Sequence, residues 1–335
     1  MEGLIDFLNI NEKLSSISLE DVSPGERYSL VVKNRLARSM NELQQKELKA
    51  SKFLKCKNCF LVKDPYCICS DLLNLSEKAN KIEILPKIKF LILMNDRELF
   101  KSSNTGKLIK MLIPDSEIFV HGIPEENDRL FERISNNLEK YNETIILFPD
   151  NKSSVSLHDC LDGFYLNHLK LIGKVLDINE NELPKDSKEL IFINKHEYYS
   201  NLCLNVILID GTWSQAKTIN KFLPKNIPRV VIKSKKISDF GPLRKQNKES
   251  NISTIEAASL LLIDIGNYVE LIENTISEKY NKDLIENKFN YKNFEIISNL
   301  LDESLNILII NVISQCKREY LRDILNERNK KRFQK

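Results

Sequence analysis

The chain has 335 residues and a net charge of +3, and 29% of its residues are charged while 42% are hydrophobic. These values are typical of a soluble globular protein with two domains or one elaborated domain, and so small a net charge does not by itself imply a nucleic-acid partner. No apolar run approaches membrane-spanning length, and the first residues, MEGLIDFLNINEKL, lack the pattern of a signal peptide. We therefore expect a cytoplasmic protein, or alternatively a nuclear one, with no membrane partner and no obligate protein partner.

The first 53 residues are expected to form a polar and helical segment. Residues 1–24 are polar, whereas residues 26–53 contain neither glycine nor proline, which predicts a helix.

Four of the seven cysteines lie within fourteen residues, as a C-x-x-C pair followed by a C-x-C pair. Four thiolates in two close pairs can enclose a tetrahedral zinc ion. Two disulfides or four free thiols are the alternatives, although disulfides are rare inside cells. We expect residues 54–86 to contain a structural zinc cluster followed by a polar linker at about 71–86. The predicted metal ligands are Cys56, Cys59, Cys67 and Cys69.

Strands and helices alternate between residues 87 and 283. Apolar runs predict strands at residues 87–94, 117–120, 144–148, 206–209 and 229–232, and helical stretches separate them, except for an irregular stretch from about 150 to 203. This alternation predicts an α/β fold, with a mostly parallel sheet and helices on both of its faces.

Residues 284–335 are expected to form a helical extension with a basic tail. Apolar residues recur there at helical spacing, which favours a core position over a surface that faces a partner. They are Phe294, Ile297, Leu301, Leu305, Leu308 and Val312.

Polar turns follow the predicted strands, at the edge where open α/β sheets place their ligands. The most informative is Asp210-Gly211-Thr212-Trp213, which contains the only tryptophan of the chain. A structural alternative is that Asp210 caps the next helix and Trp213 fills a gap under it. Ser253 with Glu256 three positions on has the pattern of a capping box. Neither GxGxxG nor GxxxxGK[ST] is present, which argues against a Rossmann dinucleotide site or a P-loop.

Five motifs, taken in order along residues 54 to 275, resemble those of the DTW-domain proteins, which are tRNA-uridine aminocarboxypropyltransferases. They are Cys56-x-x-Cys59 with Cys67-x-Cys69; Glu98 with Lys101-Ser102-Ser103-Asn104-Thr105-Gly106; Leu147-Phe148-Pro149-Asp150; Asp210 to Lys217; and Ser253 to Ala257. The chain departs from many bacterial members, whose first strand ends in His-Pro, because it has Asn95-Asp96 there. It also has Lys101 where an arginine is common.

The resemblance implies a fold like that of the SPOUT enzymes, with a carboxy-terminal trefoil knot that binds S-adenosylmethionine. The implied reaction transfers the 3-amino-3-carboxypropyl group of S-adenosylmethionine to N3 of a tRNA uridine and releases methylthioadenosine. Because N3 must lose a proton to become a nucleophile, a base is needed within hydrogen-bond reach, and Asp210 is the best placed carboxylate. Trp213 is the second expected catalytic residue, since it can stack on adenine or on a flipped uracil, or form the pocket wall. The expected co-substrate contacts are Leu147, Phe148, Pro149, Asp210, Gly211, Thr212, Trp213, Ser253, Thr254 and Glu256.

The partner that this reaction requires is tRNA. Residues 229–248 contain seven basic residues and one acidic residue, and such a stretch beside the site would neutralise phosphates. Arg229 is counted among them. The expected RNA contacts are Lys101, Ser103, Asn104, Thr105, Lys233, Lys235, Lys236, Arg244 and Lys245.

Three alternatives remain open. One is an S-adenosylmethionine-dependent RNA methyltransferase on the same scaffold, and another is an aminocarboxypropyltransferase that acts on ribosomal RNA. The third is a non-catalytic, zinc-bearing RNA-binding adaptor, although an adaptor does not need a carboxylate in a ligand pocket.

Overall fold

A computed structural model describes residues 23–48, 54–113, 115–135, 142–149, 154–176, 195, 197–232, 238–241, 243, 252–279 and 290–333.

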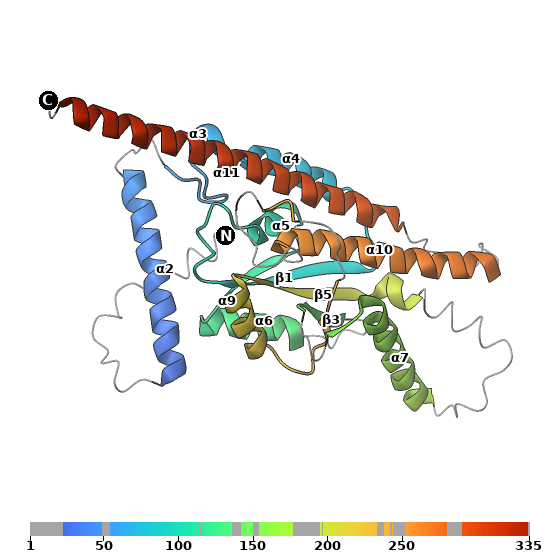
Figure 1. Cartoon of the computed structure of the whole chain (residues 1–335). Helices are drawn as coiled ribbons and strands as arrows, with labels where there is room; N and C mark the ends of the chain where they lie inside the picture. The colour runs from blue at the N-terminus through green and yellow to red at the C-terminus, as the bar shows by residue number, and fades with distance from the viewer. Residues whose placement is uncertain are drawn as a thin grey trace.

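The centre of the protein is a parallel sheet (Figure 1), and its strands lie in the order β2-β1-β5-β3-β6-β4. Its strands are β1 (Lys87–Asn95), β2 (Glu117–His121), β3 (Asn142–Leu147), β4 (Ser154–Val155), β5 (Cys203–Asp210) and β6 (Arg229–Val230). Every described strand pair is parallel, and β1 pairs with β5 from Lys87 opposite Cys203 to Met94 opposite Asp210. The predicted α/β class and parallel sheet are therefore confirmed.

Helices cover both faces of this sheet. Leu91 and Leu93 of β1 pack on the face covered by α6 (Pro124–Ser135) and α9 (Trp213–Phe222). Phe90 and Ile92 point to the opposite face, where α5 (Gly106–Leu112), α7 (Leu157–Leu176) and α10 (Thr254–Lys279) lie. Burial on both faces explains why the strand sequences are continuous apolar runs.

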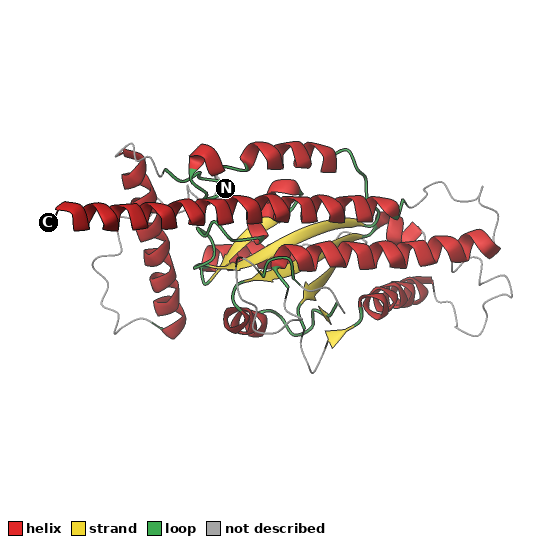
Figure 2. Ribbon diagram, turned by 45° about the horizontal axis from the view of Figure 1, so that its top comes forward, coloured by secondary structure: helices red, strands yellow, loops and turns green. Residues whose placement is uncertain are grey.

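A long helix, α11 (Lys292–Phe333), runs alongside α10 (Figure 2). All six apolar residues predicted to be core are buried, from Phe294 to Val312. The two helices approach closely at Gly266, where a Cβ atom would lie 3.1 Å from Cβ of Phe294. Contrary to our expectation, residues 292–317 are long and apolar enough by composition to cross a membrane. The six predicted core side chains pack against the protein, whereas Ile296 and Ile310 of the same segment are exposed.

The N-terminal helix α2 (Pro24–Leu48) confirms the helix predicted at 26–53, as far as the described residues go. It packs beside the carboxyl ends of β1 and β2 and buries Val32 and Leu36. Arg35 forms an ion pair with Asp96, and Tyr28 lies against Gly122, whose φ of 92° suits glycine. This helix thus contacts the loop that follows β1.

Two predicted irregular segments are helical. The expected polar linker contains α4 (Cys69–Ala79), which follows the short α3 (Lys63–Tyr66), and the expected irregular stretch after residue 150 contains β4 and α7. Helix α4 buries only Leu72, Leu75 and Ala79, so its apolar pattern is sparse. Residues 177–194 of the second segment lie outside the described residues. The implied trefoil knot stays a prediction, because most of residues 233–250 lie outside them as well.

Candidate active site

A cavity of about 430 Å³ opens at the carboxyl ends of β3, β5 and β6, between the first turns of α9 and α10. This volume lies within the range of small-molecule sites, and this edge of an open parallel sheet is where such sites occur. The lining is mainly apolar. It consists of Leu147, Phe148, Pro149, Leu208, Ile209, Gly211, Trp213, Ala216, Val230, Val231, Ile232, Ile252, Ser253, Thr254 and Ala257.

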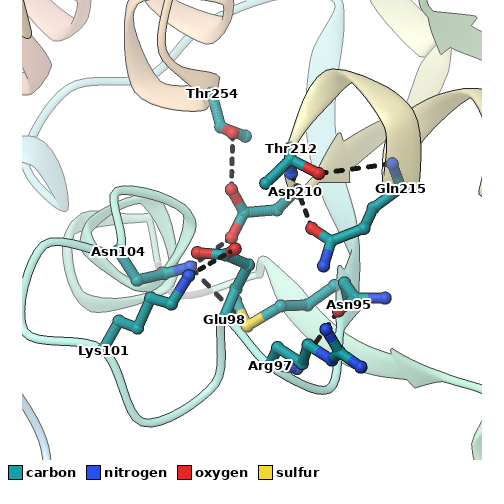
Figure 3. A network of polar contacts seen from close by, with 10 residues as sticks. Asn95, Arg97, Glu98, Lys101, Asn104, Asp210, Thr212, Gln215 and Thr254 are labelled. Carbon is teal, nitrogen blue, oxygen red and sulfur yellow. Dashed lines mark hydrogen bonds and ion pairs between the residues drawn. The ribbon is translucent and has the colours of Figure 1, made fainter. Parts of the chain in front are cut away.

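Asp210 ends β5 next to this cavity and is buried. Its Oδ1 accepts a hydrogen bond from Oγ1 of Thr254 at 2.7 Å, and its Oδ2 accepts one from the amide of Asn104 (Figure 3). Gly106 leaves room for this carboxylate, because a Cβ atom there would lie 2.9 Å from Oδ2. The first turn of α10 and the segment before α5 therefore hold Asp210 in place from two sides.

Asp210 does not cap helix α9, so the structural alternative for this residue is wrong. Thr212 is the N-cap, and its Oγ1 accepts a hydrogen bond from N of Gln215 at 3.3 Å. The side chain of Gln215 in turn accepts from N of Thr212 at 2.7 Å, which completes a capping box. Because Thr212 caps the N-terminus of α9, the Asp210 carboxylate is not needed for capping.

Residues 95–105, here called the reaction loop, connect β1 to α5. The loop is built from successive turns, such as Glu98 N to Asn95 O at 2.9 Å and Asn104 N to Lys101 O at 3.2 Å. Lys101 pairs with Glu98 at 2.8 Å, and the lysine side chain is 45% exposed while the glutamate side chain is 4% exposed. Figure 3 shows both side chains on the same side of the site as Asn104.

Both the oxygen and the nitrogen of the Asn104 side-chain amide form hydrogen bonds. Its oxygen accepts from N of Lys107 at 3.0 Å, and its nitrogen donates to Asp210. Asn104 and Thr105 are buried, and the RNA contacts expected of these two residues stay predictions. Ser103 is half-buried, and Lys101 remains the most exposed of the four.

Trp213 forms one wall of the cavity. Its ring lies 6.0 Å from that of Phe148, centroid to centroid, and the two rings are tilted by 47°. Both rings come from expected co-substrate contacts, and flat apolar walls of this kind suit a planar ligand group.

The expected capping box at the start of α10 is present. Glu256 accepts from N of Ser253 at 2.7 Å, and N of Glu256 donates to Oγ of Ser253 at 3.4 Å. Glu256 also accepts from Oγ of Ser238 and from N of Asp239, each at 2.7 Å. Its buried carboxylate thus ties residues 238–239 to α10 and is not among the described lining residues of the cavity, whereas Ser253 and Thr254 are.

A family model for the DTW domain matches residues 54–292, which is more than half of the chain. The chain belongs to the DTW-domain family. A comparison with solved structures found no significant match. The family is associated with tRNA modification, which suggests that this DTW-domain protein is a tRNA-modifying enzyme.

The cysteine cluster of the DTW-domain protein brings four sulfur atoms together. The Sγ atoms of all four predicted ligands lie within 4.8 Å of one another, with Cys56 to Cys69 at 3.5 Å and Cys59 to Cys67 at 3.8 Å. A tetrahedral zinc ion with Zn–S bonds of about 2.3 Å separates its sulfurs by about 3.8 Å. All four cysteines are free, so the disulfide alternative is wrong. The cluster could therefore hold a metal ion such as zinc.

The first cysteine pair lies on a tight turn. Lys55 and Val62 form an antiparallel bridge, and N of Cys56 donates to O of Leu61 at 2.7 Å. Phe60 follows the second cysteine with a φ of 59°, a left-handed conformation that is uncommon outside glycine. Val62 N donates to Gln315 of α11 at 3.0 Å, which anchors the turn to the long helix.

Sequence reasoning missed Lys107, whose buried side chain connects this turn to the reaction loop. Its ammonium donates to the carbonyls of Cys59 at 2.5 Å, Lys101 at 2.8 Å and Ser102 at 3.0 Å. Burial lowers the pKa of Lys107 to about 7. The one available signal was its position next to Gly106 at the start of helix α5, whose other residues are apolar apart from Lys110.

The predicted RNA-binding stretch is only partly described. Arg229 is buried and donates to the carbonyls of Pro224 at 2.5 Å and Ile227 at 2.7 Å, as well as to those of Asn220 and Leu223 at the end of α9. Counting it as a phosphate ligand was wrong, because its donors are occupied within the protein. Lys233, Lys235, Lys236, Arg244 and Lys245 lie outside the described residues, so their RNA contacts stay predictions.

Proposed function

We propose that this DTW-domain protein is a tRNA-uridine aminocarboxypropyltransferase. It would transfer the 3-amino-3-carboxypropyl group of S-adenosylmethionine to N3 of a tRNA uridine and release methylthioadenosine. The observation that carries this proposal is the juxtaposition of a buried, oriented carboxylate, Asp210, with the apolar cavity of about 430 Å³.

The cavity supports an S-adenosylmethionine site by its chemistry. Trp213 and Phe148 supply aromatic surface for adenine, while Ser253 and Thr254 supply hydroxyls at the start of α10. The first turn of a helix carries free N–H groups and a partial positive charge, which suits the carboxylate of the methionine moiety. The reaction needs this co-substrate to present its γ-carbon, and pocket shape supplies that orientation.

Asp210 is assigned as the general base. It would take the proton from N3 of uridine, whose lone pair then forms the new bond to the γ-carbon. The carbon–sulfur bond breaks at the same time, and its electrons neutralise the sulfonium, so that methylthioadenosine leaves. Because Thr254 and Asn104 donate to different oxygens of Asp210, the carboxylate has one orientation in which to receive the proton. The alternative role of Asp210, as a ligand of the sulfonium or amino group of S-adenosylmethionine, predicts instead that Asp210→Asn binds this co-substrate poorly.

The RNA would approach over the reaction loop, where Lys101 is exposed, and over the basic residues at 233–245. The cavity occupies the side of Asp210 formed by β3 and β6, whereas the reaction loop lies on the side of β1. This division leaves the β1 side for the uridine.

The cysteine cluster is proposed to bind one structural zinc ion, which thiolates at these separations suit. We also keep the SPOUT-like fold with a trefoil knot and the cytoplasmic location as parts of the proposal.

The test is mass analysis of nucleosides from tRNA incubated with the pure protein and S-adenosylmethionine. We expect a uridine that carries an aminocarboxypropyl group, together with one methylthioadenosine per modified uridine. A uridine heavier by a methyl group would instead identify a methyltransferase, and the same product from ribosomal RNA alone would change the substrate. RNA binding without any product would support the adaptor.

A further inference from the structure

The cysteine cluster and the base that we assign to Asp210 are joined by a short chain of polar contacts. Lys107 lies in the middle of this chain, and its side chain and backbone make separate contacts. Its ammonium contacts the carbonyl of Cys59 on one side and those of Lys101 and Ser102 on the other. Its backbone N holds the oxygen of Asn104, whose nitrogen contacts Asp210.

The hydrogen-bonding capacity of this ammonium is completely used. A lysine has three donors and no acceptor, and the three carbonyls are its three partners. Lys107 is only 3% exposed, although burying an unpaired charge is costly. If the side chain only filled the space between α5 and the cluster, an apolar side chain of the same length would stabilise the fold better, because it carries no desolvation cost. The specific need is therefore for a donor that can hold several carbonyls at once.

A second contact joins the same two segments. The ring of Phe60, in the turn after Cys59, meets the ring of Phe100 in the reaction loop edge to face, with centroids 5.4 Å apart. The ammonium of Lys107 lies 5.4 Å from the centre of the Phe60 ring. Because the left-handed turn at Phe60 follows directly from the cysteine pair, the position of this ring depends on the geometry of the cluster.

The reaction loop needs support from outside. Its own backbone hydrogen bonds are short-range turns, and after Asn95, the last residue of β1, its residues pair with none of the described strands. Loops of this kind open at low free-energy cost unless they are tied to the core. The ties on the side of the cysteine cluster are those made by Lys107 and Phe60.

We propose that the metal-binding cysteine cluster positions the reaction loop through Lys107, so that the cluster sets the geometry of Asn104 and Asp210. Lys107 is thus a positioning residue that acts through Asn104. This inference rests on the proposed function for its kinetic test, and its structural test does not need that function.

The structural test is amide hydrogen exchange in Lys107→Met, which keeps the length of the side chain and removes its donors. We expect the amides of residues 98–104 to exchange about tenfold faster, while β5 and α10 exchange as in the parent. Removing the metal from the parent with a chelator should accelerate the same amides. Phe100→Leu should act in the same direction with a smaller effect, and it serves if Lys107→Met does not fold.

The matched control is Ile109→Val, two positions further along α5 in the buried core. It should lower the melting temperature without changing exchange in the reaction loop. Unchanged exchange at residues 98–104 in Lys107→Met, or the same change in Ile109→Val, overturns the proposal.

The kinetic test compares the effect of Lys107→Met on kcat with its effect on KM for S-adenosylmethionine. Lys107→Met should retain its metal and its affinity for S-adenosylmethionine, which Trp213, the only tryptophan, reports by fluorescence from the cavity wall. We expect kcat to fall about tenfold to a hundredfold with KM for S-adenosylmethionine nearly unchanged, because a small misplacement of reacting groups is costly. A normal kcat refutes the positioning role. If the parent itself makes no product, the proposed function fails, and the exchange experiment still decides this inference.

Discussion

Replacing Asp210 with asparagine removes the negative charge and leaves the shape of the side chain almost unchanged. The amide oxygen can face Asn104 and accept the hydrogen bond that the carboxylate accepts now. The new NH₂ group then faces Thr254, whose hydroxyl can rotate to accept. Both contacts thus persist, but each changes from charge-assisted to neutral.

The expected loss of stability is small. Two such changes cost about 1 kcal/mol each, and the side chain no longer has to bury a charge, which offsets part of this cost. We therefore expect the free energy of unfolding to fall by no more than about 2 kcal/mol. Transfer should slow at least about a hundredfold, which corresponds to about 3 kcal/mol in activation free energy, because the amide is a far weaker base.

The assay is single-turnover transfer to tRNA, followed by nucleoside mass analysis, alongside a thermal melt and a tRNA-binding measurement. Asp159→Asn is the matched control, since Asp159 is a structural carboxylate that accepts from Oγ of Ser156 at 2.6 Å at the start of α7. This control should transfer at the parent rate. If Asp210→Asn does so as well, Asp210 has no part in the mechanism; if it binds S-adenosylmethionine poorly, Asp210 is a co-substrate ligand and not the base.

Three further predictions concern the cysteine cluster, the predicted RNA-binding stretch and the close approach of Gly106 to the Asp210 carboxylate. Cys59→Ser should lower both the metal content, expected at about one zinc per chain, and the melting temperature, and a metal-free parent with unchanged melting would contradict this. Reversing the charges of Lys235, Lys236 and Arg244 should weaken tRNA binding and flatten its salt dependence while S-adenosylmethionine affinity stays the same; intact tRNA affinity would remove this stretch from the interface. Gly106→Ala should slow transfer at least about tenfold by displacing the Asp210 carboxylate, since the added carbon would lie 2.9 Å from its oxygen, and a parent-like rate would show that the site relaxes freely.

The sequence was most informative where the signal is local. Strand β5 is a run of apolar residues ended by Asp210, and burial on both faces produces such a run directly. The clustering of the four cysteines could be predicted because their spacing within fourteen residues is itself a geometric constraint. The capping box of Ser253 and Glu256 is likewise contained in four residues.

Contacts between distant segments could not be predicted in this way. Asn104 and Asp210 are 106 positions apart, and the pairing of β1 with β5 brings the segment after β1, which contains Asn104, close to the end of β5 at Asp210. The structural role of Arg229 depends on the carbonyls that α9 leaves free at its end, which its own sequence context does not show. Short elements such as β4, with two residues, carry too little pattern to be recognised at all.

The DTW match covers residues 54–292, but helices outside this range also contribute to the folded protein. A truncation that begins at residue 54 would delete α2, and with it the guanidinium of Arg35 that holds Asp96 in the loop after β1. A truncation that ends at residue 292 would delete nearly all of α11 and expose the apolar side of α10 that Phe294 and Leu301 cover, which favours aggregation. A shortened protein for solution work should therefore retain both α2 and α11, because loss of activity after removing either helix would first indicate a damaged scaffold and not missing catalytic residues.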